Sequence, residues 1–312
     1  MNYGQAACVA LERAMAADAR VVALGEDVGR GGVFGQYRGL QQKFGAARVI
    51  DTPISESTIM GAAVGMALAG LKPVVEMRLV DFALCAMDEI VNQAAKARFM
   101  FGGQGRVPLV ARLPIGLWSG SAAQHSQSLE AWFAHVPGLV VVAPGTPQDN
   151  HSLLSAAIAC GDPVIYMEHK ELWGLEGDVV EGGNELLGKA KVIQTGGDVT
   201  LVTWSRTVQT AMQAIAKAGQ QGVSVELIDL RTIWPWDRDT VLASAAKTGR
   251  LVVAHEAVRA AGFGAEIAAT VAEELGVPVR RLGGARIPVG YAPVLEDESR
   301  LSAGAILRAL VK

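Results

Sequence analysis

The chain has 312 residues, of which 50% are hydrophobic and 19% are charged. This composition excludes a largely disordered protein, and the length predicts about two domains at roughly 150 residues each. The 28 basic and 31 acidic residues leave a net charge of −3. Because the basic residues are scattered along the chain, we expect neither nucleic acid nor a membrane surface as a partner.

The cysteines and the start of the chain predict a cytoplasmic protein. Cys8, Cys85 and Cys160 are far apart and form no CxxC pair, so neither a disulfide framework nor a structural zinc site is expected. The first residues lack the basic segment of a signal peptide. The richest apolar run, residues 59–71, is too short to span a bilayer.

The first part of the chain alternates short β-rich apolar runs with longer helical patterns. The predicted strands are residues 21–24, 74–77, 107–110, 139–142 and 164–166, and another that ends at residue 50. The predicted helices are residues 5–17, 57–69, 83–101 and 147–159. This alternation predicts a mostly parallel sheet with helices on both faces.

A Gly- and Glu-rich stretch, residues 174–188, interrupts the alternation and predicts a linker. The alternation then restarts with predicted strands at residues 199–203, 223–228 and 251–254, and predicted helices at residues 208–218, 240–247, 266–275 and 303–310. We therefore predict an α/β protein with two doubly wound, mostly parallel sheet domains, residues 1–185 and 186–312.

The glycine-rich turns do not match a nucleotide-binding fingerprint. The run Gly29–Gly35 follows a strand but has the wrong spacing, and Glu26 and Asp27 lie where a pyrophosphate needs backbone N–H groups. The later Gly262-Phe263-Gly264 lacks the third glycine. Both read better as ordinary turns, so an NAD or ATP enzyme is disfavoured.

Two polar segments stand out from this background. Glu56 lies between a strand and the helix that is expected to start at Ser57. Its carboxylate could simply interact favourably with the positive end of the helix dipole, while Ser55 or Ser57 caps the helix. The helix that follows is rich in small residues, which indicates a close subunit or domain contact.

The second segment is Gln124-His125-Ser126-Gln127, which follows a Gly/Ser-rich loop and precedes a helix expected near Ser128. His125 is placed to face a cleft and to move protons near neutral pH. A polar turn that caps the helix explains the pattern equally well.

Together with further motifs, these segments resemble the beta subunit of the thiamine-diphosphate-dependent decarboxylating component of 2-oxo acid dehydrogenase complexes. This family includes the pyruvate, branched-chain and acetoin enzymes. The matching motifs are Leu24-Gly25-Glu26-Asp27-Val28, Gly31-Gly32-Val33-Phe34, Asp51-Thr52-Pro53-Ile54-Ser55-Glu56, Val80-Asp81-Phe82, Ile90-Val91-Asn92-Gln93-Ala94-Ala95-Lys96, Gln124-His125-Ser126-Gln127-Ser128-Leu129-Glu130, His135-Val136-Pro137-Gly138-Leu139, Ile228-Asp229-Leu230-Arg231-Thr232 and Lys247-Thr248-Gly249-Arg250-Leu251.

The resemblance implies a transketolase-like pyrimidine-binding domain followed by a transketolase C-terminal domain. It also implies a heterotetramer of two alpha and two beta subunits that shares thiamine diphosphate and serves a lipoyl-bearing acyltransferase core. The alpha subunit of this family holds the diphosphate through Mg²⁺ with a Gly-Asp-Gly run. This chain contains no such run, so a partner is expected to supply it.

The resemblance assigns roles to four residues. Glu56 matches the carboxylate that bonds the aminopyrimidine ring nitrogen, which makes it both catalytic and cofactor-binding. His125 matches the loop histidine that assists proton transfer and reductive acylation of the lipoyl group. Phe82 matches an aromatic that packs on the pyrimidine ring, and Ile54 is a weaker candidate for cofactor contact.

Some family members also hold a potassium ion through backbone carbonyls. The matching positions are Leu109, Ala157, Ile158, Cys160 and Asp162. Cys160 stands where the family frequently has a carboxylate.

Arg78 and Trp118 leave alternatives open. Strand alternation puts Arg78 on the face of Phe82, where it could attract a substrate with a second anionic group. It could also pair with Asp81 or Glu76. Trp118 could narrow the substrate channel or pack at a subunit interface.

The leading function is decarboxylation of a 2-oxo acid, pyruvate or branched-chain, with acyl transfer to a lipoyl group. The runs at 100–103 and 168–170 resemble acetoin enzymes instead, whereas residues 228–236 lean towards branched-chain enzymes. A non-catalytic scaffold subunit is the alternative from another class, and it predicts that Glu56→Gln changes no activity of the complex.

Overall fold

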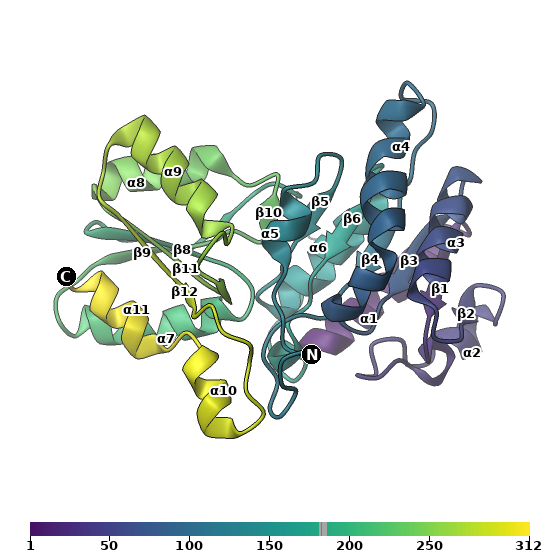
Figure 1. Cartoon of the computed structure of the whole chain (residues 1–312), viewed down its shortest axis with the longest axis horizontal. Helices are drawn as coiled ribbons and strands as arrows, with labels where there is room; N and C mark the ends of the chain where they lie inside the picture. The colour runs from purple at the N-terminus through teal and green to yellow at the C-terminus, as the bar shows by residue number, and fades with distance from the viewer. Residues whose placement is uncertain (181, 183–185) are drawn as a thin grey trace. The chain divides into compact units, whose positions relative to one another are not determined.

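A computed structural model describes residues 1–180, 182 and 186–312 of the chain. The chain divides into two units: Met1–Ile115 with Trp132–Leu187, and Gly116–Ala131 with Gly188–Lys312 (Figure 1). The segment that carries His125 therefore belongs to the second unit. Residues 181 and 183–185, which include one side of the predicted domain boundary and part of the predicted linker, lie outside the described residues.

The first unit is built on a sheet whose neighbouring strands run parallel. Its strands lie in the order β5-β6-β4-β3-β1-β2. Their bounds are Val21–Gly25 (β1), Val49–Asp51 (β2), Lys72–Glu76 (β3), Val110–Arg112 (β4), Val140–Val142 (β5) and Val164–Tyr166 (β6). Three of them, β1, β5 and β6, are nearly continuous apolar runs, as expected for strands buried on both faces.

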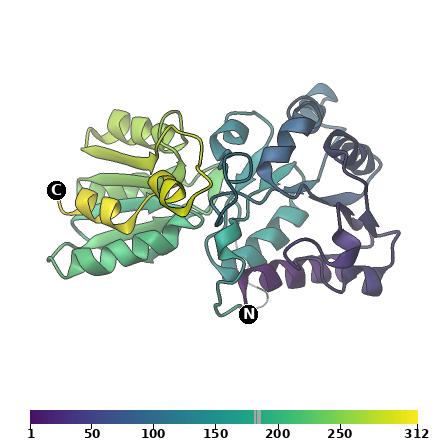
Figure 2. The same cartoon turned by 60° about the horizontal axis from the view of Figure 1, so that its bottom comes forward.

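Helices cover this sheet, and α1 packs against α6 (Figure 2). The helices are α1 (Tyr3–Ala17), α2 (Leu40–Phe44), α3 (Glu56–Leu68), α4 (Ala95–Met100) and α6 (Pro147–Ala159). Shorter turns are η1 (Val28–Arg30), η2 (Val80–Ala86), η3 (Glu89–Ala94) and η4 (Lys170–Leu172). Leu11, Leu153 and Leu154 bury the face shared by α1 and α6.

The second unit holds a five-stranded sheet of order β12-β11-β8-β9-β7, in which only the edge strand β7 is antiparallel. Its strands are β7 (Lys191–Gln194), β8 (Val199–Thr203), β9 (Val225–Asp229), β11 (Leu251–Val258) and β12 (Val279–Gly284). In Figure 1, α7 (Thr207–Gly219) and α11 (Ala303–Leu310) cover one face, and α8 (Arg238–Thr248) and α9 (Gly264–Leu275) cover the other. Shorter elements are β10 (Thr232–Trp234) and α10 (Pro293–Ser299). The short helix α5 (Glu130–Ala134) begins in this unit and ends in the first.

The predicted class, two mostly parallel α/β sheets, is confirmed. The helix expected over residues 83–101 is not continuous, because it divides into η2, the π-helical turn η3 and α4. Asp88 accepts side-chain hydrogen bonds from Asn92 at 2.7 Å and from Gln93 at 3.2 Å. The second bond joins residues five apart, which matches the wider π turn.

The elements that the sequence did not predict are short or carry charges. Strand β12 includes Arg280 and Arg281 and is only partly buried, so it lacks the apolar run used to predict strands. The strand expected at residues 107–110 is observed as β4 at Val110–Arg112, so the two share only Val110. No helix in the described part of the chain is long and apolar enough to cross a membrane.

Candidate functional site

The carboxyl ends of three neighbouring strands bring the candidate residues of the first unit together. Gly25 at the end of β1 pairs with Asp51 of β2 and with Glu76 of β3. The chain segments that follow these strand ends carry Glu26 and Asp27 after β1, Glu56 after β2, and residues 78–82 after β3. Open parallel sheets usually bind ligands at this edge.

Glu56 is the first residue of α3 and is half-buried. The expected serine cap is absent, because Ser55 bonds to the Thr58 hydroxyl and Ser57 donates to Glu89. The Glu56 carboxylate forms no hydrogen bond within the residues that the structure describes. It is therefore open to an external donor.

Glu26 lies close enough to Glu56 for the charge of Glu56 to affect the pKa of Glu26. Burial raises the pKa of Glu26, and the negative charges of Glu56 and Asp27 raise it further, while the Arg78 guanidinium opposes the shift. The site therefore combines three carboxylates with a single nearby arginine among the described residues.

Arg78 pairs with the loop after β1 rather than with its sequence neighbours. Its Nη1 lies 2.9 Å from Oδ2 of Asp27 and 3.5 Å from Oε2 of Glu26. The expected pairing with Asp81 or Glu76 is wrong. Arg78 and Asp27 both have left-handed backbone, with φ of 52° and 58°. This conformation is uncommon for residues other than glycine, and it turns the two side chains into the same cluster.

The loop that carries Glu26 is tied to the segment that leads to Glu56. The Gly29 N–H donates to Oδ1 of Asp51 at 2.7 Å, and the Thr52 N–H donates to the Gly25 carbonyl at 3.1 Å. A Cβ on Gly29 would lie 2.3 Å from Oδ2 of Asp51. Only glycine permits this approach, so the two acidic segments are held at a fixed separation.

Phe82 and Ile54 differ in their surroundings. Phe82 is half-buried in η2 and its N–H donates to the Leu79 carbonyl. Because residues 80–86 form a 3₁₀ helix, the expected strand alternation of Arg78 with Phe82 is wrong. Ile54 is 77% exposed, which leaves its side chain available for contact with another molecule.

A buried charged cluster, which the sequence analysis missed, lies at the ends of β3 and β4. Arg112 makes two 2.8 Å bonds to Glu168, and both side chains are fully buried. Glu76 is also buried, and burial raises its pKa to about 7, partly opposed by the Arg112 guanidinium. The sequence signal was a charged residue at the carboxyl end of each of these two strands.

His125 lies in the second unit, in an exposed loop between Gly116 and the start of α5 at Glu130. The helix thus starts two residues later than expected. The Gly116 N–H donates to the Gln127 carbonyl at 2.9 Å, so the loop closes on itself on either side of His125. Trp118 in the same loop is 44% exposed.

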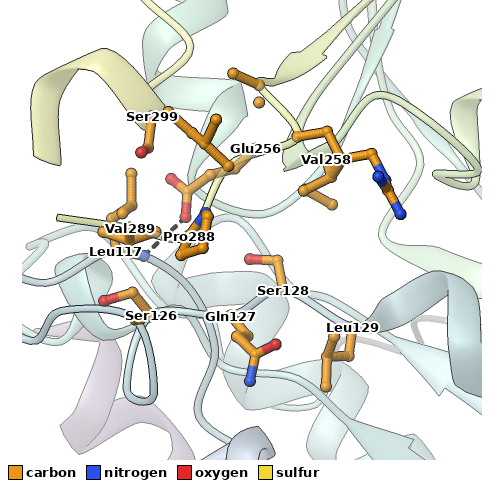
Figure 3. A pocket seen from close by; sticks show the side chains of 16 residues that line it. Leu117, Ser126, Gln127, Ser128, Leu129, Glu256, Val258, Pro288, Val289 and Ser299 are labelled. Atoms are coloured by element: carbon orange, nitrogen blue, oxygen red, sulfur yellow. Dashed lines mark hydrogen bonds between the residues drawn. The ribbon is translucent and has the colours of Figure 1, made fainter. Parts of the chain in front are cut away.

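A cavity of about 450 Å³ lies beside this loop, entirely within the second unit. Figure 3 shows Ser126, Gln127 and Ser128 of the loop on one side, with Glu256 and Ser299 opposite. The remaining lining residues are Leu117, Ala123, Leu129, Ala257, Val258, Gly284, Ala285, Arg286, Ile287, Pro288 and Val289.

The expected potassium positions have other partners. The Leu109 carbonyl accepts from Val164 and the Ala157 carbonyl accepts from Cys160. The Asp162 side chain pairs with Arg98, and Ile158 is buried in the core. Among the described residues, no group of three or more His, Cys, Asp or Glu side chains could hold a metal. A site made of backbone carbonyls thus stays a prediction.

Comparison with known proteins identifies the family. Residues 1–174 match the pyrimidine-binding domain of transketolase, and residues 188–306 match its C-terminal domain. The chain is 42% identical to the acetoin:2,6-dichlorophenolindophenol oxidoreductase subunit beta of Cupriavidus necator, over 97% of this chain and 94% of the relative. It is 43% identical to the pyruvate dehydrogenase E1 component subunit beta-1 of Arabidopsis thaliana, over 96% and 88%.

The chain belongs to the family of 2-oxo acid and acetoin dehydrogenase beta subunits.

A third member of this beta-subunit family, the 2-oxoisovalerate dehydrogenase subunit beta of Bacillus subtilis, is 40% identical over 95% of this chain and 93% of its own length. The expected family is therefore confirmed. A solved structure described as a split-gene transketolase, inactive beta4 tetramer, has a TM-score of 0.83 and covers 98% of this chain. At 21% identity, it supports the transketolase-like fold.

Proposed function

We propose that this chain is the beta subunit of a thiamine-diphosphate-dependent 2-oxo acid dehydrogenase. With an alpha subunit, it decarboxylates pyruvate or a branched-chain 2-oxo acid and reductively acylates a lipoyl group. Relatives named as pyruvate and 2-oxoisovalerate dehydrogenase beta subunits are 40–43% identical to it. The oxidoreductase class follows from these relatives.

The observation that carries the proposal is the Glu56 carboxylate. It begins a helix at the ligand-binding edge of a parallel sheet and has no hydrogen bond to a described residue. It is therefore suited to share a proton with the ring nitrogen of the aminopyrimidine of thiamine diphosphate. Bound there, the cofactor supplies a carbon nucleophile whose formation requires loss of a weakly acidic proton.

The chain's own residues would orient the ring and handle protons. Phe82 packs against the pyrimidine and the exposed Ile54 adds an apolar contact. Glu56 holds the ring proton. His125 exchanges protons during transfer of the acyl unit to the lipoyl group, a role that an imidazole can perform because it both donates and accepts a proton.

A partner must complete the cofactor site. This chain has no Gly-Asp-Gly run, so an alpha subunit would hold the diphosphate and Mg²⁺. Two alpha and two beta chains would form the enzyme and deliver acyl groups to a lipoyl-bearing acyltransferase core. The proposal also includes a potassium ion near Leu109 and Asp162. It includes a cytoplasmic location, with which the three free cysteines are consistent.

Acetoin cleavage is the second candidate. It is favoured by the 42% identity to the acetoin oxidoreductase beta subunit of Cupriavidus necator. The two candidates share Glu56 and the cofactor, and differ in the bond that is broken.

The test is dye reduction by this chain co-expressed with its alpha partner in the presence of thiamine diphosphate and magnesium. Pyruvate, branched-chain 2-oxo acids, a dicarboxylic 2-oxo acid and acetoin are compared in parallel. We expect turnover with pyruvate or a branched-chain acid. Preference for the dicarboxylic acid would indicate that Arg78 recruits a second anionic group.

Glu56→Gln separates an enzyme from a scaffold. We expect at least a hundredfold loss of turnover with assembly intact, because the amide cannot take up the proton. Glu266→Gln, an exposed carboxylate of the second unit, is the matched control. A Glu56→Gln complex with full turnover would overturn the proposal and leave a scaffold subunit.

A further inference from the structure

The loop that carries His125 is attached to the second unit by two glutamates. The Leu117 N–H donates to Oε1 of Glu256 at 2.8 Å (Figure 3). The Gly120 N–H donates to Oε2 of Glu296 at 2.9 Å. Hydrogen bonds to a carboxylate are stronger than those between neutral groups, so these two contacts fix the start of the loop.

Each glutamate is itself held in place. Glu256 lies within the long strand β11, between the buried residues His255 and Ala257. Glu296 is 4% exposed and its other carboxylate oxygen accepts from Arg300 at 3.0 Å. Both carboxylates therefore present an oxygen to the loop from a fixed position.

The end of the loop has a third attachment. Oε1 of Glu130 accepts from Nε1 of Trp204 at 3.0 Å, and both residues are buried. The Trp204 indole stacks on the His255 ring, with centroids 5.0 Å apart. Burial lowers the pKa of His255 to about 4, so this ring is neutral and serves as packing.

The glycines around His255 explain why this support is rigid. A Cβ added at Gly262, Gly264 or Gly283 would lie 2.7, 2.8 or 3.0 Å from the His255 ring. The backbone therefore encloses the ring closely, which leaves it little freedom to move. The stacked pair formed with Trp204 is correspondingly fixed.

Between these attachments, the residues that follow His125 border the cavity. The cavity lies against Ser126, Gln127 and Ser128. The hydroxyls of Ser126 and Ser299, although their residues are only 5% and 7% exposed, have no hydrogen-bond partner among the described residues. The loop also contains left-handed backbone at Ala122, with φ of 54°, which costs energy unless its surroundings impose it.

We propose that Glu256 and Glu296 are positioning residues for His125. By holding the N–H groups of Leu117 and Gly120, they set the conformation of the loop and so the place of the imidazole during acyl transfer. The inference rests on the proposed function, since it takes His125 as the residue that assists reductive acylation. It gives the C-terminal domain, in which the sequence showed little catalytic signal, a direct part in the reaction.

The experiment measures reductive acylation of a lipoyl domain by the assembled complex. Glu256→Ala and Glu296→Ala each remove an acceptor, whereas Glu256→Gln and Glu296→Gln keep a carbonyl oxygen for the same N–H. We expect about a tenfold loss of kcat for each alanine variant, from the usual strength of such bonds. KM for the 2-oxo acid should be unchanged, and the glutamine variants should recover most of the activity.

Glu298→Ala is the matched control, because Glu298 is an exposed carboxylate two residues further along α10. We expect full activity from it, and gel filtration must show an intact complex for every variant. Equal losses for the alanine and glutamine variants, or an unchanged kcat in the alanine variants, would overturn the positioning role.

A double-mutant cycle with His125→Ala separates positioning from general stability. If Glu256 acts through His125, adding Glu256→Ala to the His125→Ala complex costs less than about twofold. A full further tenfold loss would overturn the inference while leaving the function of His125 intact. A His125→Ala complex with full lipoyl acylation would instead contradict the proposed function of His125 itself, and the positioning role with it.

Discussion

Glu76 is buried, although a glutamate is usually exposed. It ends an apolar strand and is buried beside the pair formed by Arg112 and Glu168. A buried pair of this kind costs a large desolvation energy and depends on good geometry. A second buried carboxyl is tolerated because burial raises its pKa to about 7, so that it is largely uncharged below neutral pH.

This raised pKa makes stability depend on pH. Because the folded state binds the proton more tightly than the unfolded chain, the free energy of unfolding falls as pH rises from about 4.5 to about 7. Glu76→Gln removes this term. We expect the variant to gain roughly 2 to 3 kcal/mol over the wild type between pH 4.5 and pH 8, measured by urea unfolding of the purified chain. A stability difference that is constant across this range would contradict the assignment.

The residues of the site were predictable to different degrees. Glu56, Phe82, Ile54 and His125 came from their resemblance to family motifs, and their roles remain predictions. The partner of Arg78 was not predictable, because the two left-handed residues that bring it to Asp27 belong to segments about fifty positions apart. Propensity and periodicity describe neighbours in the chain and carry no information on such tertiary contacts.

At the scale of the elements, the long apolar strands and amphipathic helices were predicted well. Strand β8 and helices α6 and α11 have the predicted bounds, since their patterns are long and end at clear capping or turn residues. Short edge strands such as β12 were missed, because solvent exposure on one side lets charged residues replace the apolar pattern. Part of an expected helix is a π turn, and Asn92 and Gln93 of this turn donate hydrogen bonds to Asp88 before it.

The loop before β5 depends on a close contact with α4. Gly138 has φ of 102°, and a Cβ there would lie 1.9 Å from the Ala95 carbonyl oxygen. We expect Gly138→Ala to lower the free energy of unfolding by about 3 kcal/mol, from backbone strain and overpacking together. Urea unfolding of the purified chain measures this change.

Gly65→Ala is the matched control for that substitution. Gly65 lies inside α3 with ordinary helical backbone, and nothing lies within 4 Å of an added Cβ. We expect it to raise stability by about 0.5 to 1 kcal/mol, because alanine loses less backbone entropy than glycine in a helix. Equal effects of the two substitutions would show that the contact at Gly138 is not tight.

At the scale of the whole molecule, the residues proposed to act on the cofactor and on the lipoyl group lie in separate units. Glu56 and Phe82 belong to the first unit, whereas the His125 loop belongs to the second although it is inserted in the sequence of the first. The insertion could not be predicted, because alternation of strands and helices says nothing about which unit a loop packs on. In the structure, the hydrogen bonds to Glu256 and Glu296 attach the loop to the second unit.

This arrangement explains why the chain is expected to act with a partner. The acidic edge of the first unit offers carboxylates suited to a pyrimidine ring, and the sequence lacks the Gly-Asp-Gly run associated with a magnesium-bound diphosphate. In the proposed enzyme, one chain would provide half of a cofactor site. We propose that Glu56 activates the cofactor that the two subunits would share.

The most direct measurement is the rate at which the reactive thiazolium proton of thiamine diphosphate exchanges with deuterium in the assembled complex. Wild type, Glu56→Gln and the control Glu266→Gln are compared with cofactor fully bound. We predict exchange at least a hundredfold slower in Glu56→Gln than in the other two. Exchange at the wild-type rate in Glu56→Gln would contradict the claim.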